Sequence, residues 1–253
     1  MPHHPAPAVT AGAWARTPLP RPRARLRLLC LHPAGAGPTL YRSWPAALPA
    51  DVELVAVQLP GRESRLAEAP LTDYREAVTA LHTALRPYLD EPYALFGHSM
   101  GALLAYGLAR AAVRPPLRLF VSGAAGPGSE QEKPGRANWS EAELVAELRE
   151  NGGTPEAVLA EPELLDLILP TLRADYAICD SFDSHAGPAG PLLDCPVTVL
   201  GGLADTVSAA DLRRWAATTT GPTTCHTYAG GHFFLTGDSA PAVLATLAAA
   251  LVG

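Results

Sequence analysis

The chain alternates short apolar runs with longer segments of helical periodicity. The apolar runs predict buried strands at 25–31, 52–58, 93–96, 117–122, 196–200 and 223–228. Segments whose apolar residues recur near every 3.6 positions predict helices at 41–48, 73–88, 100–113, 209–217 and 240–251. Strands that alternate with helices in this way form a mostly parallel sheet with helices on both faces. The fold class predicted from the pattern is therefore α/β.

Two stretches of the chain depart from the alternation. Between about residues 126 and 190 a Gly- and Pro-rich start is followed by two or three predicted helices, and Ser140 with Glu143 has the spacing of a capping box. This insertion is too long for a connecting loop, so we expect a helical lid over the carboxyl edge of the sheet. Residues 1–22 are rich in Pro, Ala and Arg and lack the apolar stretch of a secretory signal. We predict a disordered leader there and a single domain over 23–253.

Composition and charge narrow the class of protein. The formal net charge is −6 over 253 residues, which argues against nucleic acid as a partner. No apolar run is long enough to cross a membrane. The four cysteines form no Cys-x-x-Cys pair, so we expect neither a zinc site nor a redox motif, and reduced thiols suggest a cytoplasmic protein. Nothing indicates an obligate oligomer, and we expect a monomer.

Four arginines, at positions 21, 23, 25 and 27, are the local exception to the acidic balance. Two interpretations stay open at this point. The arginines form either a solvated edge beside the first strand or a docking patch for an acidic partner.

The pentapeptide at 97–101, Gly-His-Ser-Met-Gly, has the form of a nucleophile elbow. It follows the predicted strand 93–96 and opens the predicted helix 100–113, which is the context that such an elbow requires. The turn is so tight that the positions flanking Ser99 need glycine. His98 is expected to point away from Ser99. With this motif in place, the predicted fold becomes an α/β-hydrolase fold.

A serine hydroxyl becomes an effective nucleophile when a base removes its proton. Of the eight histidines, His232 is the candidate, because it follows the last predicted strand in a Gly-Gly-His loop on the same sheet edge as Ser99. The carboxylate that orients this imidazole is assigned to Asp205, just past the preceding strand. Asp211, in the helix that follows, is the alternative. The order Ser, Asp, His along the chain is the one expected for this fold.

Acyl transfer also requires N–H donors for the oxyanion that develops in the transition state. The backbone N–H of Met100 is one donor by its position after the nucleophile. The second is assigned to the N–H of Ala34, in the Gly-rich loop after the first strand. These groups need no cofactor and no metal.

Several segments together resemble the type II thioesterases of polyketide and nonribosomal peptide synthesis. The resemblance extends from about residue 28 to about residue 235, through LLCLHPAGAG, LYRSWPAALP, VELVAVQLPGRESR, YALFGHSMGALLAYGLAR, GGTPEAVLAEPELLDLILPTLRADY and GGHFFL. The pentapeptide at 97–101 carries it specifically. So do Leu-Pro-Gly-Arg-Glu at 59–63 and Leu-Pro-Thr-Leu-Arg-Ala-Asp at 169–175, which have no general role in the fold.

The resemblance implies that Ser99, Asp205 and His232 are catalytic, in agreement with the residue-based argument. It further implies a free-standing editing enzyme that hydrolyses acyl thioesters on the phosphopantetheine arm of acyl or peptidyl carrier proteins. Such carriers are acidic, so docking on a chain of net charge −6 needs a local basic or apolar patch. Two alternatives stay open: a related esterase or acyltransferase that uses a free ester or another acyl acceptor, and a catalytically silent binding protein on the same scaffold.

Overall fold

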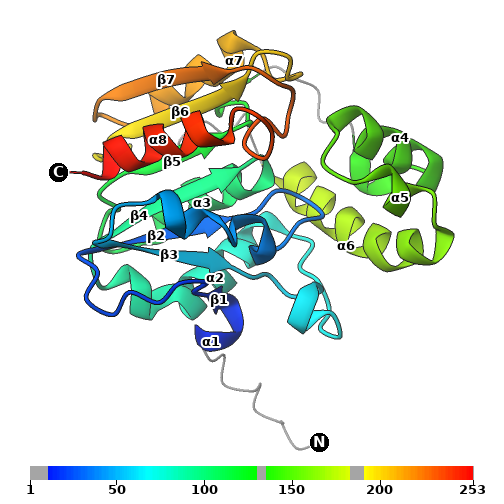
Figure 1. Cartoon of the computed structure of the whole chain (residues 1–253), viewed down its shortest axis with the longest axis horizontal. Coiled ribbons are helices and arrows are strands. Elements are labelled where there is room, and N and C mark those ends of the chain that lie inside the picture. The colour runs from blue at the N-terminus through cyan, green and yellow to red at the C-terminus, as the bar shows by residue number, and fades with distance from the viewer. Residues whose placement is uncertain (1–10, 130–134, 183–190, 253) are drawn as a thin grey trace, which may run out of the picture.

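The structure is a computed structural model that describes residues 11–129, 135–182 and 191–252. A seven-stranded sheet forms the centre of this part of the chain (Figure 1). The strand order is β1-β3-β2-β4-β5-β6-β7, with β1 antiparallel to β3 and every other neighbouring pair parallel. The strands are β1 (Ala15–Arg16), β2 (Leu26–Leu31), β3 (Val52–Val57), β4 (Tyr93–His98), β5 (Leu119–Ser122), β6 (Val197–Gly202) and β7 (Thr223–Tyr228). The predicted mostly parallel sheet is confirmed.

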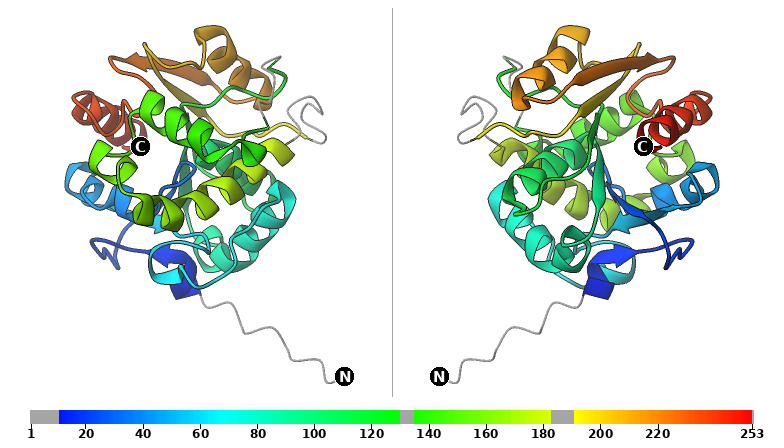
Figure 2. Two further views of the ribbon diagram at one scale, coloured as in Figure 1. Left: turned by 90° about the vertical axis from the view of Figure 1, so that its right-hand side faces the viewer. Right: turned by 90° about the vertical axis from the view of Figure 1, so that its left-hand side faces the viewer.

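Helices cover both faces of this sheet (Figure 1 and Figure 2). On one face lie α1 (Ala11–Trp14), α2 (Tyr74–Leu89), α3 (Met100–Ala111) and α7 (Ala209–Arg213). The other face is covered by α8 (Ala240–Leu251) and the 3-10 helices η1 (Pro38–Tyr41) and η2 (Trp44–Ala47). A short 3-10 helix, η3 (Glu63–Arg65), follows β3.

The central strands are buried on both faces, which explains their nearly continuous apolar sequence. In β2, Leu29 and Leu31 pack into the core beside α2 and α3, whereas Leu28 and Cys30 pack into the core beside α8. Successive side chains of a strand point to opposite faces, so each such strand contributes to two cores.

Helices α4 (Glu141–Asn151), α5 (Glu156–Leu159) and α6 (Pro162–Ser181), with the 3-10 helix η4 (Arg136–Asn138), lie within the predicted insertion. They share an apolar cluster of their own. The capping box that the sequence predicts between Ser140 and Glu143 opens α4. Figure 1 shows the strand arrowheads pointing toward these helices, and the left view of Figure 2 shows them in front of that end of the sheet. Part of the insertion, 130–134 and 183–190, lies outside the described residues.

The prediction of a disordered leader over 1–22 is wrong for its second half. Trp14 is buried, and the Arg65 guanidinium lies over its ring at 4.2 Å from the centroid. β1 pairs with β3, and the N–H of Gln58 donates to the carbonyl of Trp14 at 2.8 Å. Without this segment β3 would be the edge strand of the sheet, and an edge strand leaves backbone N–H and C=O groups unpaired. The residues of β1 form hydrogen bonds with these groups of β3. It is too short to show a periodic pattern. Residues 1–10 lie outside the described residues.

Two predicted helices are shorter or tighter than the sequence pattern indicates. The predicted helix 41–48 is replaced by η1 and η2, because a proline in the segment, Pro45, has no N–H to donate within a helix. The predicted helix 209–217 begins as α7 and continues as the 3-10 helix η5 (Arg214–Thr218). Tight 3-10 turns are common at helix ends and leave little trace in a hydrophobic pattern.

Most of the arginine row near the first strand binds acceptors of the same chain. Arg21 donates to backbone carbonyls that include that of Val52 at 2.7 Å. Arg25 pairs with Asp51 at 2.8 Å, and Arg27 pairs with Glu53 of the neighbouring strand β3 at 3.2 Å. These groups lie at the amino ends of the strands, opposite the lid (Figure 1). The arginines therefore support the sheet edge and form no basic patch beside Ser99.

Candidate active site

Ser99 occupies the sharp turn between β4 and α3. Its backbone has φ +54° and ψ −119°, a conformation that residues with a Cβ rarely adopt. A Cβ on Gly97 would lie 2.0 Å from the carbonyl oxygen of Gly101, and one on Gly101 would lie 2.2 Å from that of Leu31. Both flanking positions therefore require glycine, as the elbow pattern predicts. The turn presents the hydroxyl above the carboxyl edge of the sheet, beside the first N–H groups of α3.

Asp205 and His232 meet at the same edge, from the loops after β6 and β7. The Nδ1 of His232 lies 3.0 Å from Oδ2 and 3.1 Å from Oδ1 of Asp205. The Asp205 side chain is 1% exposed and the His232 side chain 15% exposed. Oδ1 of Asp205 also accepts the N–H of Val207 at 3.3 Å. With Nδ1–H donating to the carboxylate, Nε2 is the basic nitrogen of the neutral ring.

The alternative carboxylate, Asp211, has a different surrounding. It lies in the first turn of α7, which Ser208 caps, and its carboxylate oxygens accept hydrogen bonds from the hydroxyls of Ser208 at 2.5 Å and Ser129 at 2.7 Å. These bonds hold the pKa of Asp211 below its ordinary value. The carboxylate in contact with the His232 ring is thus that of Asp205.

Two further histidines lie near the site, and both are buried. His98 donates to or accepts from the Ser122 hydroxyl at 2.9 Å, and its ring centroid lies 4.9 Å from that of His232. Burial, together with the neighbouring His232, holds the pKa of His98 well below its ordinary value. Burial and the nearby Arg62 lower the pKa of His32 to about 3. Both rings are therefore neutral at physiological pH. The sequence argument missed the contact between His98 and His232.

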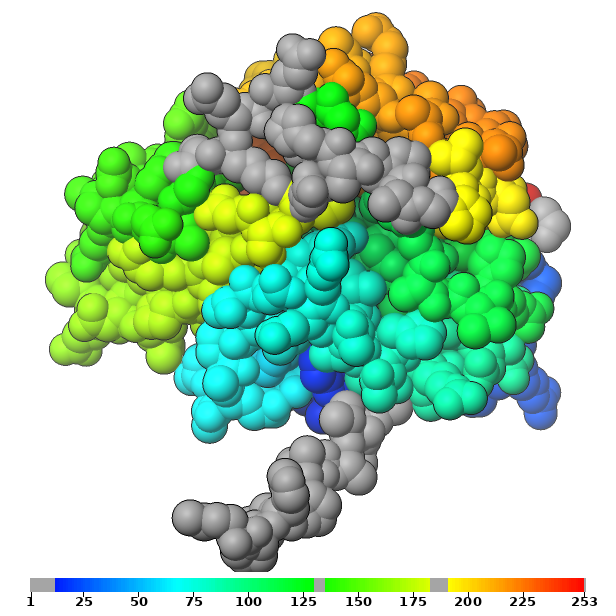
Figure 3. Space-filling model, turned by 180° about the vertical axis from the view of Figure 1, so that it is seen from behind, coloured from blue at the N-terminus to red at the C-terminus, as the bar shows by residue number. Residues whose placement is uncertain are grey.

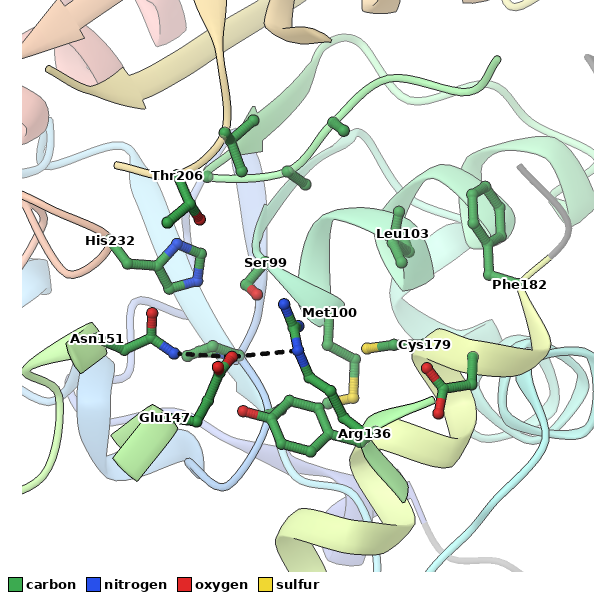
Figure 4. A pocket seen from close by; sticks show the side chains of 18 of the residues that line it. Ser99, Met100, Leu103, Arg136, Glu147, Asn151, Cys179, Phe182, Thr206 and His232 are labelled. Carbon is green, nitrogen blue, oxygen red and sulfur yellow. Dashed lines mark hydrogen bonds and ion pairs between the residues drawn. The ribbon is translucent and has the colours of Figure 1, made fainter. Parts of the chain in front are cut away.

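A cavity of about 210 Å³ brings the predicted site residues together. It is lined by Ser99, Met100, Ala34 and His232, with Asp205 behind the imidazole. In Figure 4 the Ser99 hydroxyl and the His232 ring lie on the sheet side of this cavity. The two backbone positions assigned as oxyanion donors thus flank the serine on the cavity wall.

The opposite wall of the cavity belongs to the lid and contains a cluster of polar side chains beside apolar ones such as Leu148 and Phe182. Arg136 Nε lies 3.1 Å from Glu147 Oε1, and Asn151 donates to the same oxygen at 3.3 Å (Figure 4). The Arg136 guanidinium also lies over the Tyr176 ring at 5.3 Å from its centroid. Sequence reasoning missed this wall, because helical periodicity does not reveal which lid residues face the cavity.

A parallel sheet, a serine on a strained strand-to-helix turn and a carboxylate–imidazole pair at the same sheet edge together define an α/β hydrolase of the serine type. Residues 26–251 match the Thioesterase domain family. The chain belongs to this thioesterase family, whose members hydrolyse thioesters.

The relatives of this chain include a gramicidin S biosynthesis protein and a fatty acid synthase thioesterase. Gramicidin S biosynthesis protein GrsT of Aneurinibacillus migulanus is 36% identical over 213 residues, which cover 82% of each chain. The medium-chain S-acyl fatty acid synthase thioesterase of Homo sapiens is 34% identical over 215 residues, covering 82% of this chain and 80% of that protein.

Solved structures give the same result. The type II thioesterase BorB from the borrelidin biosynthetic cluster is 39% identical, with a TM-score of 0.84 over 93% of this chain and 96% of that one. The thioesterase RedJ from the prodiginine biosynthetic pathway in Streptomyces coelicolor is 36% identical, with a TM-score of 0.81 over 90% of this chain and 87% of that one. The predicted α/β-hydrolase fold and the resemblance to type II thioesterases are confirmed.

Among the residues that the structure describes, every helix is too short or too polar to traverse a bilayer.

Proposed function

We propose that this thioesterase hydrolyses acyl thioesters on the phosphopantetheine arm of acyl or peptidyl carrier proteins. It thereby frees a polyketide or nonribosomal peptide synthase of stalled or wrong acyl groups. The observation that carries the proposal is the 3.0 Å contact between Asp205 and His232, beside a cavity that Ser99 lines under a lid. The similarity to BorB, a type II thioesterase from the borrelidin biosynthetic cluster, and to RedJ, a thioesterase from the prodiginine biosynthetic pathway, supports the assignment.

Acylation in this proposal begins with proton transfer from the Ser99 hydroxyl to Nε2 of His232. The serine oxygen attacks the thioester carbonyl carbon, and the carbonyl oxygen becomes an oxyanion that the N–H groups of Ala34 and Met100 stabilise. When the tetrahedral intermediate collapses, the C–S bond breaks and the imidazolium protonates the departing thiolate. Asp205 stabilises the imidazolium and holds the ring in the tautomer that the reaction needs.

Deacylation repeats the sequence with water as the nucleophile. Nε2 of His232 removes a proton from water, the water oxygen attacks the acyl ester, and the C–O bond to Ser99 breaks as the serine regains its proton. The products are the free acid and the carrier thiol. Each step uses only side-chain and backbone groups of this chain and water, so the proposed reaction needs no cofactor beyond the arm that the partner carries.

The lid is the element that this proposal assigns to arm and acyl binding. A carrier delivers its acyl group at the end of a long, thin arm, so the cavity has to accept a narrow substrate from the surface. A site roofed by α4 and α6 rather than an open groove fits this mode of delivery.

A comparison of substrates tests the proposal. The same acyl group is presented to the enzyme on a carrier protein, on coenzyme A and on p-nitrophenol, and the released acid or thiol is quantified by mass spectrometry. We expect the highest kcat/KM with the acyl-carrier protein and no turnover by Ser99→Ala with any of the three.

Two outcomes would contradict the proposal. A kcat/KM on the carrier no greater than on coenzyme A would remove the editing role and favour an acyl hydrolase that uses free esters or thioesters. An active-site serine that fails to react with a fluorophosphonate would favour a catalytically silent protein instead.

A further inference from the structure

The structure brings together two sequence motifs that the triad leaves unexplained. Arg62, of the Leu-Pro-Gly-Arg-Glu segment, forms a two-pronged ion pair with Asp175, of the segment at 169–175. Nη1 lies 2.7 Å from Oδ2 and Nη2 lies 2.7 Å from Oδ1. The two side chains are 5% and 0% exposed. A buried pair of this kind is costly to desolvate and by itself is weak evidence for stability.

Both members of the pair also bind the loop between β2 and η1, which contains Ala34. Oδ2 of Asp175 accepts the N–H of Gly35 at 2.8 Å. Nη1 of Arg62 donates to the carbonyl of Ala36 at 3.0 Å. Gly35 has φ +72°, and a Cβ there would lie 3.1 Å from a methyl of the α6 residue Leu172. The loop is therefore held at the two residues that directly follow the assigned oxyanion donor.

Glu63, the neighbour of Arg62, binds the first turn of η1, where the same loop ends. A carboxylate oxygen of Glu63 accepts the N–H of Thr39 at 3.1 Å. Glu63 has φ +45°, and among the described residues it and Ser99 are the non-glycine residues with positive φ. Strained backbone of this kind persists only where the surroundings enforce it. One of these two residues presents the candidate nucleophile, and the other binds the start of η1, which directly follows the loop that contains Ala34.

We propose that Arg62 and Asp175 are positioning residues, which aim the N–H of Ala34 at the oxyanion through Gly35 and Ala36. This inference rests on the proposed function in one respect, since it takes Ala34 as an oxyanion donor. Fixing the direction of the Gly35 N–H and the Ala36 carbonyl restricts the dihedral angles of the loop, so the donor is preorganised before the substrate arrives.

The Arg62–Asp175 pair also connects the lid to the loop that contains Ala34. Asp175 belongs to α6, a lid helix, whereas Arg62 belongs to the segment after β3. Figure 3 shows from behind the yellow-green surface of α6 against the cyan surface of that segment, and the Thr171 hydroxyl donates to the carbonyl of Gly61 at 2.6 Å at this contact. The carboxylate that holds the oxyanion loop is therefore supplied only while α6 is docked.

A double variant and a matched control separate this role from a purely structural one. Asp175→Asn removes the charge but leaves Arg62 buried without its partner, which could impair folding. The double variant Arg62→Met/Asp175→Leu replaces the whole pair by apolar groups, a change that buried pairs commonly tolerate. Thr171→Val is the matched control, because it removes a contact of the same helix with the same segment and leaves the Gly35 acceptor in place.

The measurements are kcat and KM for p-nitrophenyl butyrate and the inhibition constant of a trifluoromethyl ketone, whose adduct with the serine carries an oxyanion. In the folded double variant we expect kcat to fall about 10- to 100-fold, less than the about 10²- to 10³-fold loss for deleting an oxyanion donor. The inhibition constant should rise by the same factor, with KM changed less than about twofold, because KM reflects ground-state binding when chemistry is slow relative to substrate dissociation. Thr171→Val should keep wild-type kcat.

Three results would overturn the proposal. They are a folded double variant with wild-type kcat, a loss of kcat without weaker binding of the ketone, and an equal loss in Thr171→Val. An aryl ester is used because its hydrolysis does not depend on carrier recognition. Failure of the carrier assay and failure of this inference therefore remain distinguishable.

Discussion

Ser99 keeps a sparsely populated backbone conformation, which costs a residue about 1–3 kcal/mol, and its surroundings hold it there. Its N–H donates to the carbonyl of Ser122 at 2.7 Å, and the adjoining helix α3 is buried along most of its length. His232 is held differently, by a carboxylate that is itself buried and bonded to the N–H of Val207. Each group of the candidate triad is therefore fixed by local contacts of its own, so substitutions there should affect chemistry more than folding.

The first prediction at this scale distinguishes the two candidate carboxylates. Asp205→Asn should fold normally and lose about 10⁴-fold in kcat, because an amide no longer selects the imidazole tautomer that the reaction needs. Asp211→Asn is the control and should retain most activity, since Asp211 contacts Ser129 and Ser208 rather than the imidazole. The measurement is kcat of both variants with circular dichroism as a check on folding. The reverse ranking would move the acid to Asp211.

A second prediction concerns acid stability. Burial lowers the pKa of His32 from 6.5 to about 3, so between these pH values the unfolded chain binds a proton that the folded chain does not. The free energy of unfolding should therefore fall as the pH drops below about 6.5, by up to about 1.4 kcal/mol per pH unit, and this loss is complete near pH 3. The lowered pKa of buried His98 acts in the same direction.

Urea denaturation at about pH 7.5 and about pH 5.5 checks this expectation. The midpoint should fall with acidity in the wild type and fall less in His32→Gln. Equal pH dependence in the two proteins would show that His32 does not contribute.

At the scale of helices and strands, the sequence pattern predicts the elements whose signal is long or strongly apolar. Strands of the buried sheet and the helices at 73–88 and 240–251 fall within a residue or two of their observed positions. The pattern fails for η1, η2 and η5, which are too short to have a period, and for β1, whose pairing depends on a strand edge distant in sequence. Short elements take their structure from tertiary contacts, which a local window does not contain.

The N-terminal segment that contains α1 and β1, which the sequence pattern did not predict, leads to a third prediction. Trp14→Ala should lower the free energy of unfolding by about 3 kcal/mol, because it leaves a cavity in the core beside α2 and removes the contact with Arg65. Leu19→Ala is the control, since Leu19 is 47% exposed and its loss should change stability by less than about 0.5 kcal/mol. Urea unfolding of the two variants is the measurement. Equal stabilities would mean that this segment adds nothing to the fold.

At the scale of the whole molecule, the site lies between the carboxyl edge of the sheet and the helical lid. The loops at the carboxyl edge of the sheet carry the candidate nucleophile, base and acid, and their meeting at one place could be predicted because the carboxyl ends of parallel strands lie at one edge. The lid supplies the opposite wall, which could not. Arg62 and Asp175 are 113 residues apart, and no period or spacing links them until α6 docks on the sheet. The motifs were visible in the sequence, but their pairing was not.

The polar lid wall leads to a fourth prediction, about acyl selectivity. An alkyl chain that packs against the Arg136–Glu147 pair removes water from charged groups, which is unfavourable. Replacing the pair, in Arg136→Met/Glu147→Leu, should raise kcat/KM for a hexanoyl thioester by roughly 10-fold, the equivalent of about two buried methylenes. An acetyl thioester, too short to reach the lid, should show no change.

Arg149→Gln is the control for this prediction, because it breaks a lid ion pair with Glu156 that is exposed on both sides. Its acyl preference should match that of the wild type. If the double variant also keeps the wild-type preference, the Arg136–Glu147 pair has no part in selecting the acyl group.

The most direct test of the central claim is to identify the atom that carries the acyl group during turnover. The enzyme is mixed with an acyl thioester, quenched in acid within the first turnover and mapped by peptide mass spectrometry. We predict one acyl group, esterified to Ser99, that is absent in Ser99→Ala and accumulates far more slowly in His232→Ala. An acyl group on any other residue, or thioester hydrolysis by Ser99→Ala at the wild-type rate, would contradict the account.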